Sequence, residues 1–390
     1  MKRFGMPVIF LASLLFSLVF GGALAYEVKS FMYAVSLVTK ELLVFSLPFV
    51  VFALISNSII KLGAKALGYV VVIVALVCAS NFMNTMLSYL ISTNISTIDV
   101  SAINANAGGD HELFPMFTMQ LGTLISNDIA IVFGALLGLG MAFWGGSKSE
   151  KLTSILSIFT GWFFKVLVPL MPLFIMGTAV KLQHDGMLTR ICQQYLPILL
   201  VFVVSAYGYV VVQFFALARF SASRCLEYIR NVFPALVAAF GSMSSTVAMP
   251  LSIKGAEKNL DDGCNAGIII PATVNIHLVG DCFFIPSIAI AVMVSFGMQC
   301  PGLSDYLPFA LHFVLAKFAV AAVPGGGVLV MLPVMQKYLG LSSEMLALVT
   351  AVYVLFDPLI TTCNVAGNGA LAIAFEKVVS ALKRKKKAIH

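Results

Sequence analysis

Long apolar runs separated by short polar stretches recur through the first half of the chain. They cover residues 7–26, 41–60, 66–92, 114–144, 152–180 and 191–217. Roughly 20 apolar residues are enough to cross a bilayer as a helix. We therefore expect each of these runs to form a transmembrane helix.

In the second half of the chain the apolar runs are interrupted. A glycine- and serine-rich stretch, residues 241–246, divides one run, and Pro324 with the three glycines after it divides another. Charged residues flank the first of these runs at both ends, which indicates a segment that enters and leaves the membrane on one side. Its non-helical tip must then be lined by protein or water. We expect two re-entrant helical hairpins, at about residues 232–258 and 304–338.

Each hairpin is followed by a complete span, at about residues 264–298 and 344–378. Interrupted segments in corresponding positions of two halves are typical of transporters with inverted repeats and a binding site near the midplane. The expected fold is an all-α polytopic membrane protein with eight transmembrane helices, two re-entrant helical hairpins and inverted repeats.

The last span carries a polar stripe. Asp357, Thr361, Asn364 and Asn368 follow one another at i, i+4, i+7 and i+11 in an otherwise apolar run. On a helix this spacing places the four side chains on one face. An ionisable side chain in a span is costly unless it faces protein or a water-filled cavity. We interpret the stripe as one wall of a binding site inside the membrane.

The composition excludes a soluble enzyme with a membrane anchor. Of the 390 residues, 60% are hydrophobic and 11% are charged, whereas soluble domains carry about 25% charged residues. The sequence has no HExxH or GxSxG motif, and its seven cysteines form no CxxC pair. We expect no enzymatic activity, no organic cofactor and no dedicated transition-metal site.

The basic residues indicate the orientation in the membrane. They cluster at residues 383–387, directly after the last span, and at the N-terminus before the first apolar run. Because basic residues favour the cytoplasmic side, we expect both termini, including a basic tail at 379–390, in the cytoplasm of a plasma or inner membrane. The net charge of +7 is therefore not a sign of nucleic-acid binding. The first run also fits a cleavable signal peptide, although its length favours a retained span.

Motifs in the second half resemble those of the dicarboxylate/amino acid:cation symporter family, the glutamate transporter family. They are SSTVAMP at 244–250, PATVN at 271–275, AVPGGG at 322–327, and Asp357 with Thr361, Asn364 and Gly367. Each motif is weak alone, but their order and spacing resemble the family's. The resemblance covers residues 240–375 best.

The resemblance implies a division into two parts. A scaffold would comprise residues 1–65 and 93–190, and a mobile transport part residues 66–92 and 191–378. It also implies a homotrimer in the lipid bilayer, an elevator motion, and a second hairpin that acts as the outer gate.

The resemblance also implies a substrate site. Asp357 suits a substrate ammonium, because charge pairs are strong in a low-dielectric site, and Asn364 offers both a donor and an acceptor. Carriers of acidic amino acids in the family have an arginine where this chain has Ile360, so a neutral amino acid is favoured over a dicarboxylate. The other residues expected at the substrate are Ser244, Ser245, Thr246, Pro324, Gly325, Gly327 and Thr361.

Residues expected to take part in cation coupling are Thr273, Asn275, His277, Asp281 and Asn368. The family has carboxylates where this chain has His277 and Asn368, so a sodium cage is weakened but not excluded. A histidine titrates near neutral pH, and Asp281 would lie one turn from His277 if that segment were helical. A neutral buried histidine is the alternative. The expected coupling cation is Na⁺ or H⁺.

The function expected from the sequence is secondary active symport of a small amino acid, with a neutral one favoured, driven by a cation gradient. A dicarboxylate:cation symporter is the nearest alternative. An alternative of another class is a substrate sensor or anion channel that keeps the fold without transporting.

Overall fold

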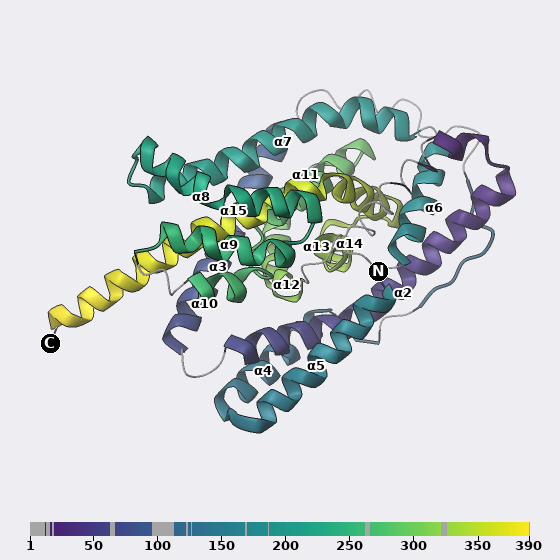
Figure 1. Ribbon diagram of the computed structural model, residues 1–390. Helices are drawn as coiled ribbons and strands as arrows, with labels where there is room; N and C mark the ends of the chain where they lie inside the picture. The colour runs from purple at the N-terminus through teal and green to yellow at the C-terminus, as the bar shows by residue number, and fades with distance from the viewer. Residues whose placement is uncertain are drawn as a thin grey trace.

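The structure, a computed structural model, is built from helices (Figure 1). It describes residues 12, 16–17, 19–62, 67–95, 113–121, 124–125, 127–167, 170–185, 187–261, 266–320 and 326–389, and within these ranges it contains no β-strand. The α-helices are α2 (Tyr26–Leu62), α3 (Leu67–Ile95), α4 (Asn127–Trp144), α5 (Gly146–Leu167), α6 (Met171–His184), α7 (Met187–Leu217), α8 (Ala222–Ser242), α9 (Ser245–Asn259), α10 (Ala266–Thr273), α11 (Val279–Ser295), α12 (Leu303–Ala316), α13 (Gly326–Leu329), α14 (Leu332–Leu339) and α15 (Ser343–Ile389). Short 3-10 turns are η1 (Gly21–Ala23) and η6 (Lys317–Ala319).

Several helices are long and apolar enough to cross a membrane. Among the described residues these are Val71–Ile95, Leu199–Leu217 and Ser343–Leu382, and shorter apolar helices occur at Val132–Trp144, Pro172–Lys181 and Val279–Ser295. An all-helical fold with membrane-spanning candidates is thus confirmed. The number of spans and the re-entrant hairpins stay predictions.

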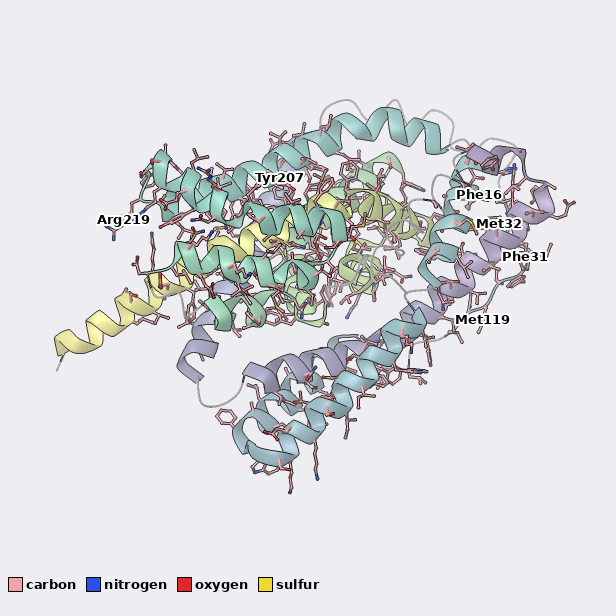
Figure 2. The ribbon with its side chains drawn as sticks, in the orientation of Figure 1. Phe16, Phe31, Met32, Met119, Tyr207 and Arg219 are labelled. Carbon is pink, nitrogen blue, oxygen red and sulfur yellow. The ribbon has the colours of Figure 1, made fainter. Side chains whose placement is uncertain are left out.

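The helices α2, α4, α5 and α6 form a peripheral group. α2 packs against each of the other three, and α4 and α5 lie away from the central helices in Figure 1. Large apolar side chains on this group are exposed, among them Phe31, Phe133 and Trp162. Figure 2 shows Phe31 at the outer edge of the molecule. Exposed apolar faces of this kind suit contact with lipid or with a second copy of the chain.

Two expected spans of this group differ from the structure. In the run 114–144 the structure has a helix at Asn127–Trp144, and residues 113–121 are not helical. The run 152–180 is covered by two helices, α5 and α6, and not by one. Apolar composition alone did not show these breaks, because a chain segment packed against other helices can be apolar without being helical.

The helix α15 forms the centre of the molecule. In its most apolar window 78% of residues are buried, against 33% in α3 and 28% in α7, so α15 is surrounded by protein. It packs against α7, α8, α9 and α11 and runs through the middle of Figure 1. It continues to Ile389, so the expected tail at 379–390 begins as a helical extension of the last span.

The helices α8 and α9 form an antiparallel hairpin. The Asn231 amide of α8 donates to Asn259 Oδ1 of α9 at 2.8 Å, at the end remote from the connecting turn. The turn consists of Met243, which adopts a left-handed conformation (φ 49°), and Ser244, the N-cap of α9. A C-terminal left-handed residue and an N-terminal serine are ordinary helix stop and start signals.

The run expected as a complete span at 264–298, the seventh span of the expected fold, is broken in the structure. α10 ends at Thr273 and α11 starts at Val279, with turns and irregular backbone between them. The second interrupted run forms α12 and η6, then α13 and α14, and α12 packs against α14. Pro324 and Gly325 lie outside the described residues.

Candidate functional site

The polar stripe of α15 is buried within the helical core. Asp357, Thr361, Asn364 and Asn368 all have less than 5% of their surface exposed. The Thr361 hydroxyl donates to Asp357 Oδ1 at 2.8 Å, along the same face of the helix. The prediction that these side chains share a protein-facing surface is therefore confirmed by their burial. Tyr207 of α7 (Figure 2) fixes this part of α15, because its hydroxyl donates to the Leu359 carbonyl at 2.9 Å.

Asp281, in the first turn of α11, joins three elements. Its Oδ2 accepts a hydrogen bond from Lys317 Nζ of η6 at 3.0 Å. Its Oδ1 accepts from the Tyr353 hydroxyl at 3.2 Å and from the Asn364 amide at 3.0 Å, both on α15. The Asp281 backbone N–H donates to Asn364 Oδ1 at 3.2 Å. The nitrogen and the oxygen of the Asn364 side chain thus both bond to Asp281. In this structure Asn364 therefore holds Asp281 in position.

His277 lies in the break between α10 and α11, next to α3. Its Nε2 is 2.9 Å from Ser80 Oγ, and its carbonyl accepts from the Asn368 amide at 3.3 Å. The hypothesis that Asp281 orients His277 required a helix through both residues. Because α11 starts only at Val279, that geometry is absent, and the Asp281 side chain accepts hydrogen bonds from Lys317, Tyr353 and Asn364.

Asn81 of α3 forms hydrogen bonds with the backbone between α10 and α11. Its amide nitrogen donates to the Ile276 carbonyl at 2.8 Å, and its Oδ1 accepts from the Leu278 N–H at 3.3 Å. Backbone groups buried away from water need such partners. One asparagine therefore pairs two groups that a continuous helix would have paired itself.

We expect Asn81→Leu to lower stability by about 3 kcal/mol, because two buried backbone groups lose their partner. The measurement is the unfolding midpoint of the detergent-solubilised protein. Asn84→Leu is the matched control, since Asn84 is also buried on α3 but donates to the Ser80 carbonyl of its own helix. Equal effects of the two substitutions would contradict the role given to Asn81.

Three polar atoms near this break have no hydrogen-bond partner in the described part of the chain. They are Asn275 Oδ1, His277 Nδ1 and Asn368 Oδ1. Buried polar atoms are seldom left unpaired, so this region suits a proton, a cation or a bound polar group. Thr273, also expected here, is buried, and its hydroxyl donates to the Ile269 carbonyl of its own helix.

The tip of the α8–α9 hairpin lies beside the stripe. Ala248 of α9 and Val365 of α15 share one apolar cluster, and Val365 is the neighbour of Asn364. Ser244 and Ser245 are buried, whereas Thr246 is exposed. Ser244 Oγ accepts from the Val247 N–H at 3.4 Å and so caps α9. Of the expected tip residues, the two serines are placed toward the core.

Two residues of this region, Lys317 and Tyr353, were missed from the sequence. Lys317 is the only charged residue between Tyr306 and Met335, and a lone charge in an apolar run is a functional signal by itself. Tyr353 stands four residues before Asp357 and extends the stripe by one turn. Gly327, expected from the resemblance, lies close to both, and its carbonyl is 3.4 Å from Lys317 Nζ.

Curated relatives of this chain are amino acid transporters by name. Excitatory amino acid transporter 2 of Homo sapiens is 27% identical over 143 residues, which are 36% of this chain and 25% of that protein. L-cystine uptake protein TcyP of Bacillus thuringiensis (strain Al Hakam) is 32% identical over 174 residues, which are 43% of this chain and 37% of that protein. The matched part of the chain thus covers less than half of either relative.

The family match extends much further than these pairwise matches. A profile described as the Sodium:dicarboxylate symporter family matches residues 7–378, which include the peripheral helices, both interrupted runs and the stripe of α15. The resemblance inferred from four short motifs is thereby confirmed. The chain belongs to the sodium:dicarboxylate symporter family, a family of integral membrane transporters and not of enzymes.

Proposed function

We propose that this protein is a symporter that couples uptake of a small neutral amino acid to a gradient of Na⁺ or H⁺. The observation that carries the proposal is the buried carboxylate of Asp357, 3% exposed and one turn from Thr361 on the central helix. A buried carboxylate in a transporter core suits a cationic partner. The ammonium group of an amino acid supplies one, together with donors for the nearby hydroxyl.

The choice of a neutral substrate rests on the absence of a cation for a second carboxylate. From Ser343 to Glu376, α15 has no lysine or arginine, and Ile360 is fully buried in the apolar core. Lys317 is paired with Asp281. A substrate with an acidic side chain would therefore bury a charge on α15 without a partner, which is strongly unfavourable. The named relatives carry amino acids, which supports the substrate class.

The division into scaffold and transport parts is supported by packing. α3 packs against α11 and α12, in agreement with the assignment of residues 66–92 to the transport part. α2, α4, α5 and α6 pack mainly on one another. An ion pair at 3.1 Å joins Lys181 of α6 to Glu344 of α15 across the proposed boundary, so an elevator motion has to break it.

In this proposal α8–α9 is the first re-entrant hairpin, and α12 to α14 form the second. The eight spans, the homotrimer and the cytoplasmic termini belong to the same proposal. The polar atoms of Asn275, His277 and Asn368 that lack partners are candidates for the coupling cation, since broken helices in transporters supply such sites.

The test is uptake by the purified protein in proteoliposomes. A panel of amino acids and dicarboxylates is offered while a sodium gradient and a pH gradient are imposed separately. We expect a neutral amino acid to accumulate above equilibrium under at least one of them, and no accumulation when the gradient is dissipated. Empty liposomes are the control.

The same experiment separates the alternatives. Accumulation of dicarboxylates alone would replace the proposed substrate class. Substrate binding without accumulation would favour a sensor, and an anion current without accumulation would favour a channel. Either of these last results would contradict symport.

A further inference from the structure

Lys317 provides a fully buried positive charge in the second interrupted run. Its side chain is 0% exposed and that of Asp281 is 2% exposed, with Nζ and Oδ2 3.0 Å apart. Nζ also lies 3.4 Å from the Gly327 carbonyl and 4.7 Å from the centre of the Phe313 ring. The ammonium therefore sits between a carboxylate oxygen, a carbonyl oxygen and the face of an aromatic ring.

The absence of a side chain at Gly327 lets the Asp281 carboxylate and the Tyr353 hydroxyl lie close to its backbone. A Cβ atom on Gly327 would lie 2.1 Å from Asp281 Oδ2 and 2.4 Å from the Tyr353 hydroxyl. Any other residue at 327 would thus displace the Asp281 carboxylate and the Tyr353 hydroxyl from their present positions. Lys317 belongs to η6 and Gly327 to α13, so two elements of the second interrupted run meet at Asp281.

Stability alone does not account for such a pair. Burying two charges costs as much as their attraction returns, and apolar residues of similar volume are often as stable. The oxygen atoms around the ammonium, one of them anionic, are instead the kind of ligands that hold Na⁺ where transporter helices are broken. The ammonium contacts two such oxygens, one from Asp281 and one from Gly327.

We infer that Lys317 is a tethered cation, which takes the place of an exchangeable monovalent ion between α11, α15 and the second interrupted run. The inference rests on the proposed function, because it concerns which sites carry the coupling ion. An ammonium bound to its own chain cannot leave with the substrate. This site therefore contributes no coupling ion, and coupling is left to the separate polar atoms near His277 and Asn368.

The test is whether sodium replaces the missing ammonium. In Lys317→Ala the Asp281 carboxylate keeps its oxygen neighbours but loses its cation. We expect about 100 mM sodium, compared with choline at equal ionic strength, to raise the unfolding midpoint of full-length Lys317→Ala by about 4 °C more than that of the parent protein. Sodium chloride is the only probe, and transport is not needed for the readout.

Two control variants test whether the added sodium response depends on the Asp281 carboxylate without its lysine. Lys337→Ala removes an exposed lysine from α14 and should leave the sodium response of the parent unchanged. The neutral double variant Lys317→Met/Asp281→Asn should show no added response, because the anionic ligand is gone. A sodium response of Lys317→Ala equal to that of the parent would overturn the inference.

A folding defect would also be informative. If Lys317→Ala and the bulkier Lys317→Gln both fail to fold in sodium while the double variant folds, sodium does not replace the ammonium and the inference is wrong. The proposed symport can fail independently, since an added sodium response in a protein that accumulates no substrate would leave the tethered cation supported and remove the transport function.

Discussion

Asp357→Asn is expected to reduce the initial rate of concentrative uptake by about 100-fold, because a buried charge pair that loses one partner costs several kcal/mol. Asparagine has nearly the same shape and keeps an oxygen that can accept from the Thr361 hydroxyl, now 2.8 Å from Asp357 Oδ1. The change therefore removes the charge and can keep this hydrogen bond. The measurement is uptake of the best panel substrate in proteoliposomes.

Asp305→Asn is the matched control for this experiment. Asp305 is an exposed residue of α12, so the variant loses the same charge at a distance from the stripe, and its uptake should equal that of the parent. The unfolding midpoint of each variant is measured alongside. If Asp357→Asn kept the parent's rate and substrate concentration dependence, Asp357 would not bind the ammonium group. A fall in uptake explained by a fall in folded protein would assign it a structural role.

The stripe of α15 could be predicted from the sequence because it depends on local geometry. Side chains four and seven residues apart share a helix face wherever the helix lies, and the cost of a carboxylate facing lipid requires that face to pack against protein or a water-filled cavity. The interruption at residues 241–246, where Met243 and Ser244 form the turn, was also visible locally. In each case a short stretch of residues determines the conformation.

The partners of Asp281 could not be predicted in the same way. Asp281 was assigned to His277 because the two are close in sequence, yet its recorded ion pair is with Lys317, 36 residues away. Asn81, which binds the broken backbone, is 195 residues from Ile276. Contacts between elements depend on how the helices pack, and residues far apart in the sequence carry no local pattern that indicates this packing.

The predicted boundaries of two helices were wrong for a related reason. Residues 114–121 belong to an apolar run, but they are not helical in the structure. The run 152–180 divides near Leu170, before Pro172 in the first turn of α6, where a proline is favourable. An apolar composition indicates that a segment is buried in lipid or protein. It does not by itself determine the backbone conformation.

The second large effect is expected from separating the buried ion pair. In sodium-free buffer, Lys317→Met and Asp281→Asn should each lower the free energy of unfolding by about 4 kcal/mol, because each leaves one charge buried without its partner. The double variant should lose only about 1 kcal/mol, since no charge is then buried. Chemical unfolding in mixed micelles gives the free energies for this cycle.

The choice of asparagine at 281 makes the cycle interpretable. Its Oδ1 can still accept from the Tyr353 hydroxyl and the Asn364 amide, which now lie 3.2 Å and 3.0 Å from Asp281 Oδ1. The variants therefore differ mainly in charge, and strong non-additivity measures the dependence of one charge on the other. Additive losses in the double variant would show that the two side chains act separately, and the description of Lys317 as a cation held by Asp281 would have to be abandoned.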